Sequence, residues 1–285
     1  MRIDLHTHSS ASDGTDTPAD LVREAAAAGL DVVALTDHDA MSGWDEAQRA
    51  ADEVGITLVP GIEISTTFRH RGVHLLGYLP DPSYPPLVAE LDRILAGRTE
   101  RTPTMVAALQ AHGIEITADD VRREAGGSVA AGRPHVADAL VRLGVVRDRG
   151  EAFETLLNAG RPGYVNRYAA PLERMIPLVT EAGGATVIAH PWGRNGGTVL
   201  DEAAFASLKD LGLAGIEVDH QDHPPELRAR LRGIAADLDL VVTGSSDHHG
   251  LGKVDHDLGV NTTAPDHYER LLSLAGVTES GRSSL

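Results

Sequence analysis

The sequence predicts an α/β fold in which a parallel sheet is interrupted by a helical insertion. Short β-branched or apolar segments recur along the chain. Each is followed by an amphipathic stretch of helical length, and this alternation is typical of βα units. The alternation stops between about residues 80 and 164, where the pattern is helical and no convincing strand occurs. We therefore expect one α/β barrel-like unit that carries a helical insertion.

The strands and helices of the α/β unit follow from these patterns in order. Seven strands are expected at residues 2–5, 31–36, 57–65, 73–79, 185–189, 214–219 and 240–245. The first helix should begin after Thr17, which can cap it, because Pro18 suits the first helical position, and it should end at Gly29. Further helices are expected at 42–54, 172–182, 202–211 and 225–238.

The insertion is expected to contain five helices, at 87–95, 102–112, 118–124, 134–143 and 149–158. These patterns divide the chain into a barrel of residues 1–80 and 165–276 and a helical cap of residues 81–164. The cap is a candidate lid. Residues 277–285 are interpreted as a frayed C-terminal tail.

Composition limits the classes of partner. The chain has 285 residues and a formal net charge of −17, which argues against binding to duplex DNA or to anionic membranes. It contains no apolar run of the roughly 18 to 20 residues that a membrane span needs. No signal-peptide pattern opens the sequence, so a cytoplasmic location is expected. A small anionic substrate would need a local positive field, which bound cations can supply.

Potential metal ligands lie at or near the ends of nearly all predicted strands. His6 and His8 follow the first strand, and two histidines at this spacing can point at one place. Parallel strands present their C-terminal ends on one face of a barrel, so such residues should converge. The chain has no cysteine, which leaves imidazole and carboxylate ligands suited to Mn, Fe or Zn. The candidate ligands are His6, His8, Asp13, His38, Glu63, His74, His190, Asp247 and His249.

Four motifs resemble the signature of the PHP (polymerase and histidinol phosphatase) domain family: His6-Thr7-His8, Thr36-Asp37-His38-Asp39, Ala189-His190-Pro191 and Ser246-Asp247-His248-His249. The resemblance implies a distorted seven-stranded (β/α)7 barrel that holds two or three divalent metal ions. It implies one metal at His6, His8, Glu63 and Asp247, with Glu63 bridging to a second at His74 and His190. It implies a third at Asp13, His38 and His249, where some relatives have histidine in place of Asp13.

The expected reaction is hydrolysis of a phosphate ester by direct attack of water. Divalent cations that face only three carboxylates leave a positive site, which suits phosphate oxygens. Neither a cysteine nor a serine in a Gly-x-Ser-x-Gly setting offers a covalent nucleophile. Asp39 or a metal-bound water is a candidate proton donor to the leaving alcohol. The residues expected to act in catalysis are Asp13, His38, Glu63, Asp247 and His249.

The substrate is expected to be a small phosphorylated nucleotide or a short oligonucleotide. Gly132-Arg133-Pro134-His135 resembles the substrate-binding insertion of a PHP subgroup that acts on nucleotides. That subgroup includes phosphatases that remove the 3′-phosphate from nucleoside 3′,5′-bisphosphates and enzymes that trim short RNA from its 5′ end. Arg133 and His135 would then hold a second phosphate. Weaker candidates for substrate contact are Arg161, Arg167, Arg194, His220 and His223, whereas His70, His112, His256 and His267 are expected at the surface.

Three other functions remain open at this point. A histidinol-phosphate-type phosphatase would need no site for a second phosphate. An amidohydrolase-type C–N hydrolase commonly bridges its metals with a carboxylated lysine, but Lys209 lies in a predicted helix and Lys253 beyond the last strand, so Glu63 fits the bridging role better. A non-catalytic metal-binding module would be expected to have lost ligands, and this chain keeps all nine.

Overall fold

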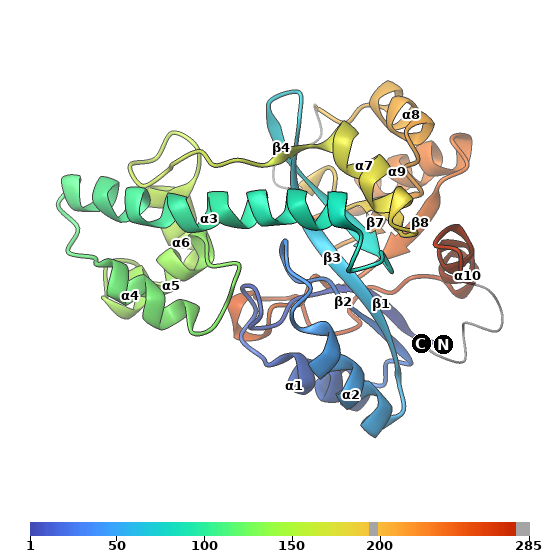
Figure 1. Cartoon of the computed structure of the whole chain (residues 1–285), viewed down its shortest axis with the longest axis horizontal. Helices are drawn as coiled ribbons and strands as arrows, with labels where there is room; N and C mark the ends of the chain where they lie inside the picture. The colour runs from blue at the N-terminus through green and yellow to red at the C-terminus, as the bar shows by residue number, and fades with distance from the viewer. Residues whose placement is uncertain (194–198, 278–285) are drawn as a thin grey trace.

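Seven strands form a nearly closed barrel in the computed structural model, which describes residues 1–193 and 199–277 (Figure 1). Their order around the barrel follows the chain, β1-β2-β3-β4-β6-β7-β8. A bridge between Thr7 and His248 brings the two ends of the sheet together. The strands are β1 (Ile3–Thr7), β2 (Val32–Leu35), β3 (Thr57–Phe68), β4 (Arg71–Tyr78), β6 (Ala185–Ile188), β7 (Gly215–Asp219) and β8 (Val241–Gly244). The distorted seven-stranded α/β barrel predicted from the sequence is confirmed.

Strand β4 departs from the predicted parallel arrangement, because it runs antiparallel to both β3 and β6. Arg69 and His70 both adopt left-handed backbone conformations, with φ of 47° and 64°. Two such residues form a tight hairpin turn between β3 and β4, which leaves no room for a crossover helix. As a result β4 begins at the edge of the barrel where the parallel strands end. His74 pairs with Ser65 at this edge. A two-residue strand, β5 (Ala170–Pro171), pairs with β3 outside the barrel order.

Helices cover the outside of the barrel in two groups. Helices α1 (Pro18–Ala27) and α2 (Trp44–Val54) pack together against β2 and β3. Thr17 caps α1 by accepting a hydrogen bond from the Asp20 amide, as the sequence predicts. The second group packs on the other part of the sheet and consists of α7 (Leu172–Glu181), α8 (Glu202–Asp210) and α9 (Pro225–Asp237).

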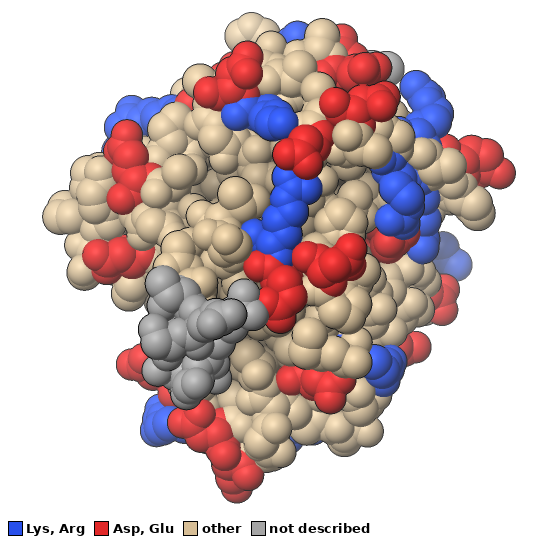
Figure 2. All heavy atoms as spheres, turned by 90° about the vertical axis from the view of Figure 1, so that its right-hand side faces the viewer, with Lys and Arg blue, Asp and Glu red and all other residues tan. Residues whose placement is uncertain are grey.

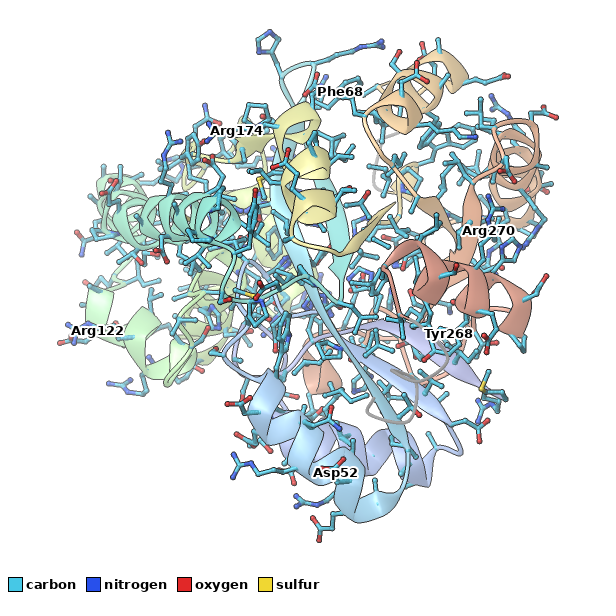
Figure 3. The ribbon with its side chains drawn as sticks, turned by 45° about the vertical axis from the view of Figure 1, so that its right-hand side comes forward. Asp52, Phe68, Arg122, Arg174, Tyr268 and Arg270 are labelled. Atoms are coloured by element: carbon cyan, nitrogen blue, oxygen red, sulfur yellow. The ribbon has the colours of Figure 1, made fainter. Side chains whose placement is uncertain are left out.

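One further helix, α10 (Pro265–Leu274), is absent from the sequence prediction. Its apolar residues Tyr268, Leu271 and Leu272 share a core with the first residues of the strands, such as Ile3 and Ala185. Tyr268 is labelled beside the N-terminal strands in Figure 3. Helix α10 therefore covers the N-terminal end of the barrel, which leaves the C-terminal end for a functional site.

The predicted insertion is helical, but the predicted break between its first two helices is wrong. Residues 87–95 and 102–112 belong to one helix of 27 residues, α3 (Pro85–Ala111), which continues through Pro103. Leu87 and Leu91 in its first half pack in the barrel core, and Met105 and Leu109 in its second half pack in another core. Burial of both halves offsets the loss of the backbone hydrogen bond at proline.

The second half of α3 packs with the other helices of the segment around a core of their own, seen at the left of Figure 1. These helices are α4 (Ala118–Ala125), α5 (Arg133–Arg142), α6 (Arg149–Ala152) and a π-helical turn (Phe153–Leu157). The boundaries of the cap at residues 81 and 164 stay a prediction. The predicted tail lies outside the described residues except for Val277.

The distribution of charged side chains on the surface agrees with the acidic composition of the chain. On the face shown in Figure 2, basic side chains alternate with acidic ones, and no broad basic area is present there. Within the described part of the chain, no helix combines the length and the apolar character needed to span a bilayer.

Candidate metal centre

The structure brings the nine predicted metal ligands together at the C-terminal end of the barrel. His6 lies in β1, Glu63 in β3 and His74 near the start of β4, while the other six lie in loops that follow strands. Most are buried, and His74 and His190 are the most exposed, with 34% and 20% of their side-chain surface accessible. Residues that are up to 243 positions apart in the sequence therefore surround one place, as the strand pattern predicts.

Glu63 lies at the centre of this cluster. Its carboxylate has histidine nitrogens at 2.7–3.4 Å from five residues: His6, His8, His38, His74 and His190. Oε2 faces the first three rings and Oε1 faces the last two. The two oxygens of Glu63 thus belong to two different groups of ligands, which is the arrangement a bridging carboxylate needs.

Asp13 marks a second part of the cluster. Its Oδ1 lies 3.4 Å from Nε2 of His249, and its Oδ2 lies 3.7 Å from Nε2 of His38. Together with a nitrogen of His8, these donor atoms all lie within 4.8 Å of one another. The predicted third group of ligands therefore has the proximity that a metal site requires.

Asp247 uses its two oxygens for different purposes. Oδ1 faces the cluster, at 3.4 Å from His8 Nε2 and 3.6 Å from His6 Nε2. Oδ2 contacts Nε2 of His220 at 3.1 Å and the Lys253 ammonium. His220 Nδ1 accepts the amide of Asp222 at 3.0 Å, so its proton resides on Nε2 and is donated to Asp247. His220 therefore orients Asp247.

The carboxylates of the cluster are ionised. Burial alone would raise their pKa values, but the surrounding histidines hold the pKa of Glu63 and of Asp13 well below the ordinary range. Burial lowers the pKa of His38 to about 3 and that of His249 to about 4, so both rings are neutral near pH 7. Burial would lower the pKa of His6 and of His8 as well, but the carboxylates beside them raise the pKa of His6 well above its ordinary value and that of His8 to about 9. A cation that binds these two rings would displace protons from them, because cations bind ionised carboxylates and neutral imidazoles.

The donor set fits divalent cations. His8 Nδ1 is buried yet makes no hydrogen bond, and His38 Nδ1, although 3.0 Å from Glu63 Oε2, lacks the geometry of a hydrogen bond. Nε2 of His6 and Nε2 of His8 lie 3.0 Å apart and point at the same region. Buried polar atoms are normally satisfied, and ring nitrogens that converge in this way are satisfied by a shared cation.

Asp39 is unsuited to the role of proton donor that its position in the sequence suggested. It accepts hydrogen bonds from the Ser65 amide at 2.6 Å, the Ser65 hydroxyl at 2.8 Å and Arg98 Nε at 2.6 Å. Burial would raise the pKa of Asp39, but the Arg98 and Arg167 guanidiniums lower it below the ordinary value. Asp39 stays ionised and anchors Arg98, which is itself buried.

Replacement of Asp39 by alanine should destabilise the protein by about 3–5 kcal/mol, because it leaves Arg98 buried without its partner. The free energy of unfolding in urea measures this loss. The exposed Glu53, paired with Arg23, offers a control, since Glu53→Ala should cost at most about 1 kcal/mol. Because the pKa of Asp39 is lower in the folded protein than in the unfolded chain, its contribution is present above about pH 4 and lost below it. Equal losses in the two variants would contradict the anchoring role.

A cavity of about 1680 Å³ lies above the cluster, between the barrel and the insertion. Candidate metal ligands such as Glu63 and His190 line one side of it. Basic side chains line it as well, among them Arg98, Arg101, Arg133 and Arg167. The cavity thus combines a candidate metal centre with a group of guanidiniums.

Arg101 is the least satisfied of these arginines. Its side chain is 7% exposed, and its Nε makes no hydrogen bond. Burial, together with the nearby guanidiniums of Arg167 and Arg133, lowers the pKa of Arg101 to about 9. The sequence analysis missed both Arg98 and Arg101. The available signal was two arginines three residues apart in a helix, which place them on one face.

The predicted substrate residues are only partly at the cavity. Arg133 and His135 line it, and His135 Nδ1 accepts the amide of Gly132 at 3.1 Å. Arg161 is exposed and does not line the cavity. Arg194 lies outside the described residues. Arg133, His135 and Arg167 are therefore the predicted substrate residues that the structure places at the cavity.

Three histidines, His220, His223 and His256, lie behind the cluster and contact other protein groups. His223 is buried, with Nδ1 2.9 Å from the carbonyl of Val218 and Nε2 accepting the amide of Trp192 at 3.3 Å, so its ring does not face the cavity. His256, expected at the surface, is buried beside His220, with ring centres 5.7 Å apart. His220 and His223 therefore support the site from behind.

Comparison with known proteins identifies the family. The model of the PHP domain family matches residues 4–166, which is more than half of the chain. The chain belongs to the PHP domain family. The PHP chain is 36% identical to the 3′,5′-nucleoside bisphosphate phosphatase of Chromobacterium violaceum, over 92% of each chain. It is also 36% identical to a 5′-3′ exoribonuclease of Haemophilus influenzae, over 87% of this chain and 90% of that protein.

A solved structure extends the likeness to the whole PHP chain. A Bifidobacterium adolescentis protein described as a metal-dependent phosphoesterase is 40% identical, with a TM-score of 0.91 and coverage of 98% of both chains. The PHP protein described here is a metal-dependent phosphoesterase, and its buried His, Asp and Glu cluster is suited to divalent metals.

Proposed function

We propose that the protein hydrolyses the 3′-phosphate of nucleoside 3′,5′-bisphosphates and releases the nucleoside 5′-monophosphate. One observation carries this proposal: the same cavity contains both the candidate metal centre and a separate group of buried arginines. A substrate with two phosphates would place one at each. The relatives named as a nucleoside bisphosphate phosphatase and as an exoribonuclease support a nucleotide substrate.

The metal centre would use the three groups of ligands described above. His6, His8, Glu63 and Asp247 would hold one cation. Glu63 would share a second with His74 and His190, and a third would lie at Asp13, His38 and His249. Imidazole with carboxylate ligands suits Mn, Fe or Zn. Bound cations supply Lewis-acid activation of the phosphate and of a water.

The arginines would bind the phosphate that is not hydrolysed. Guanidinium groups donate paired hydrogen bonds to phosphate oxygens, so Arg101, Arg133 and Arg167 suit this task. Arg167 donates to the Ser65 hydroxyl at 2.6 Å, and Arg98 donates to the same hydroxyl at 3.0 Å. The hydroxyl of Ser65 therefore holds two guanidiniums in place before a substrate arrives.

Short 5′-phosphorylated RNA is a second candidate substrate, since one relative is an exoribonuclease and the cavity has room for more than one nucleotide. Histidinol phosphate carries a single phosphate and would leave the buried Arg101 without a ligand. The three candidates are separated by assaying adenosine 3′,5′-bisphosphate, histidinol phosphate and a short 5′-phosphorylated RNA side by side, with and without chelator. Preference for histidinol phosphate would refute the proposal.

Replacement of Arg133 by alanine should lower kcat/KM for adenosine 3′,5′-bisphosphate by roughly 10- to 100-fold, as expected for a lost hydrogen bond to a charged group. Hydrolysis of p-nitrophenyl phosphate, which has one phosphate, should change little. Arg161→Ala offers a matched control, because Arg161 is exposed away from the cavity. Equal losses of both activities in Arg133→Ala would count against a second phosphate site.

A further inference from the structure

Glu217 is a buried carboxylate that none of the sequence motifs includes. It lies in the middle of β7, and its side chain is fully buried. Oε1 lies 3.0 Å from His6 Nδ1 and accepts from the Ser245 hydroxyl, and Oε2 accepts the amide of His190 at 2.7 Å. A carboxylate with a hydrogen-bond partner at both of its oxygens is therefore held directly behind the candidate ligands.

The contact with His6 fixes the position of a proton. Glu217 accepts the Ser245 hydroxyl at Oε1 and the His190 amide at Oε2, so it acts as an acceptor and Nδ1 of His6 donates to it. Nε2 is then the ring nitrogen whose lone pair is available to a cation. This nitrogen faces the cluster, at 3.4 Å from Glu63 Oε2 and 3.6 Å from Asp247 Oδ1. Glu217 thus selects the tautomer of His6 that can bind a metal.

The contact with His190 fixes a backbone conformation. His190 has a φ of 28°, in the left-handed region that residues other than glycine rarely adopt. Such a conformation persists only where the surroundings hold it. The hydrogen bond from its amide to Glu217 does so, and it leaves Nε2 of His190 3.1 Å from Glu63 Oε1.

We propose that Glu217 is a positioning residue that assembles two metal pockets at once. It sets the tautomer of His6, a ligand of the first pocket, and the backbone of His190, a ligand of the second. The inference rests on the metal centre proposed above. It distinguishes Glu217 from residues such as His74, which would serve one pocket only.

Glu217→Met tests this role with a side chain of similar length. A thioether is at most a weak acceptor, so the contacts with His6 Nδ1 and with the His190 amide are both lost. We expect the variant to bind the first two cations 10- to 100-fold more weakly, the range for the loss of a group that orients metal ligands. Binding at Asp13, His38 and His249 should change less.

The experiment measures metal stoichiometry and affinity by titrating Mn²⁺ or Zn²⁺ into chelator-treated protein, followed by elemental analysis. His74→Ala serves as the comparison, because it should weaken one cation only. A Glu217→Met protein with wild-type affinities, or one that is weakened at a single cation, would overturn the coupling. Should this variant fail to fold, Glu217→Asp keeps the charge but shortens the reach, and wild-type binding at both pockets in that variant would equally overturn it.

A second readout does not depend on the metal. The ¹⁵N chemical shifts of His6 in the metal-free protein report whether Nδ1 carries a proton, as it should in the wild type, and the signature of its hydrogen bond to Glu217 should be lost in Glu217→Met. If the wild-type protein bound no cation, the proposed metal centre would fail while this measurement still tested the contact. A wild-type His6 whose Nδ1 carries no proton would refute the inference.

Discussion

Replacement of Glu63 by alanine should reduce phosphate ester hydrolysis by roughly 10³-fold or more. Glu63 is the residue on which five histidine rings converge, and each of its oxygens faces a different group of ligands. Cations at such a site supply several kcal/mol of charge stabilisation in the transition state, and each 1.36 kcal/mol is worth a factor of ten in rate. Kinetic assays with p-nitrophenyl phosphate and elemental analysis of the same preparation measure the two losses together.

The control for Glu63→Ala is Glu115→Ala, which removes an exposed carboxylate at a distance from the cavity. It should retain both activity and metal. Circular dichroism shows whether the Glu63 variant keeps its fold, because the surrounding strands are held by an apolar core that does not include Glu63. A Glu63→Ala protein with wild-type metal content and turnover would exclude the proposed bridge.

Replacement of Arg101 by methionine should have two opposite effects. The variant should be more stable, by roughly 1–3 kcal/mol, because it removes a buried polar group that lacks a partner. Its kcat/KM for adenosine 3′,5′-bisphosphate should fall by about 10- to 100-fold, because a charged hydrogen-bond donor to the second phosphate is gone. Methionine keeps much of the length and the apolar contacts of the arginine stem. Thermal unfolding and steady-state kinetics measure the two effects.

Arg122→Met is the matched control for Arg101→Met. Arg122 lies in the same insertion but projects into solvent from α4, as Figure 3 shows, with 76% of its side chain exposed. The Arg122→Met substitution should change neither the stability nor kcat/KM by much. Inorganic phosphate should raise the unfolding temperature of the wild type more than that of Arg101→Met. A less stable Arg101→Met protein with unchanged turnover would mean that the arginine is structural.

Much of the fold and of the candidate metal centre could be predicted because the signals are local in sequence. Apolar strands can be recognised from their composition, and a histidine such as His6 or His190 lies near the end of such a strand or just after it. Because the C-terminal ends of parallel strands meet, position along the chain translates into position in space. The antiparallel direction of β4 could not be predicted from the strand pattern, because it depends on the conformation of Arg69 and His70 in a tight turn.

The residues that the sequence analysis missed act through contacts distant in sequence. Glu217 looks like any polar residue in a strand until His6 and His190 are seen on either side of it. Arg101 looks like a solvated helix residue until the insertion covers it. Continuity of α3 past Pro103 also depends on tertiary packing at both ends, which local propensity does not contain.

Helix α3 has a consequence for ligand size. An α-helix is a rigid rod that rises 1.5 Å per residue, and this rod is anchored in the barrel at Leu87 and in the insertion at Leu109. Arg98 and Arg101 project from the same rod into the cavity. The positions of these guanidiniums relative to the barrel are therefore built into the scaffold, so under the proposed function α3 would set the spacing between the two phosphates that the cavity accepts.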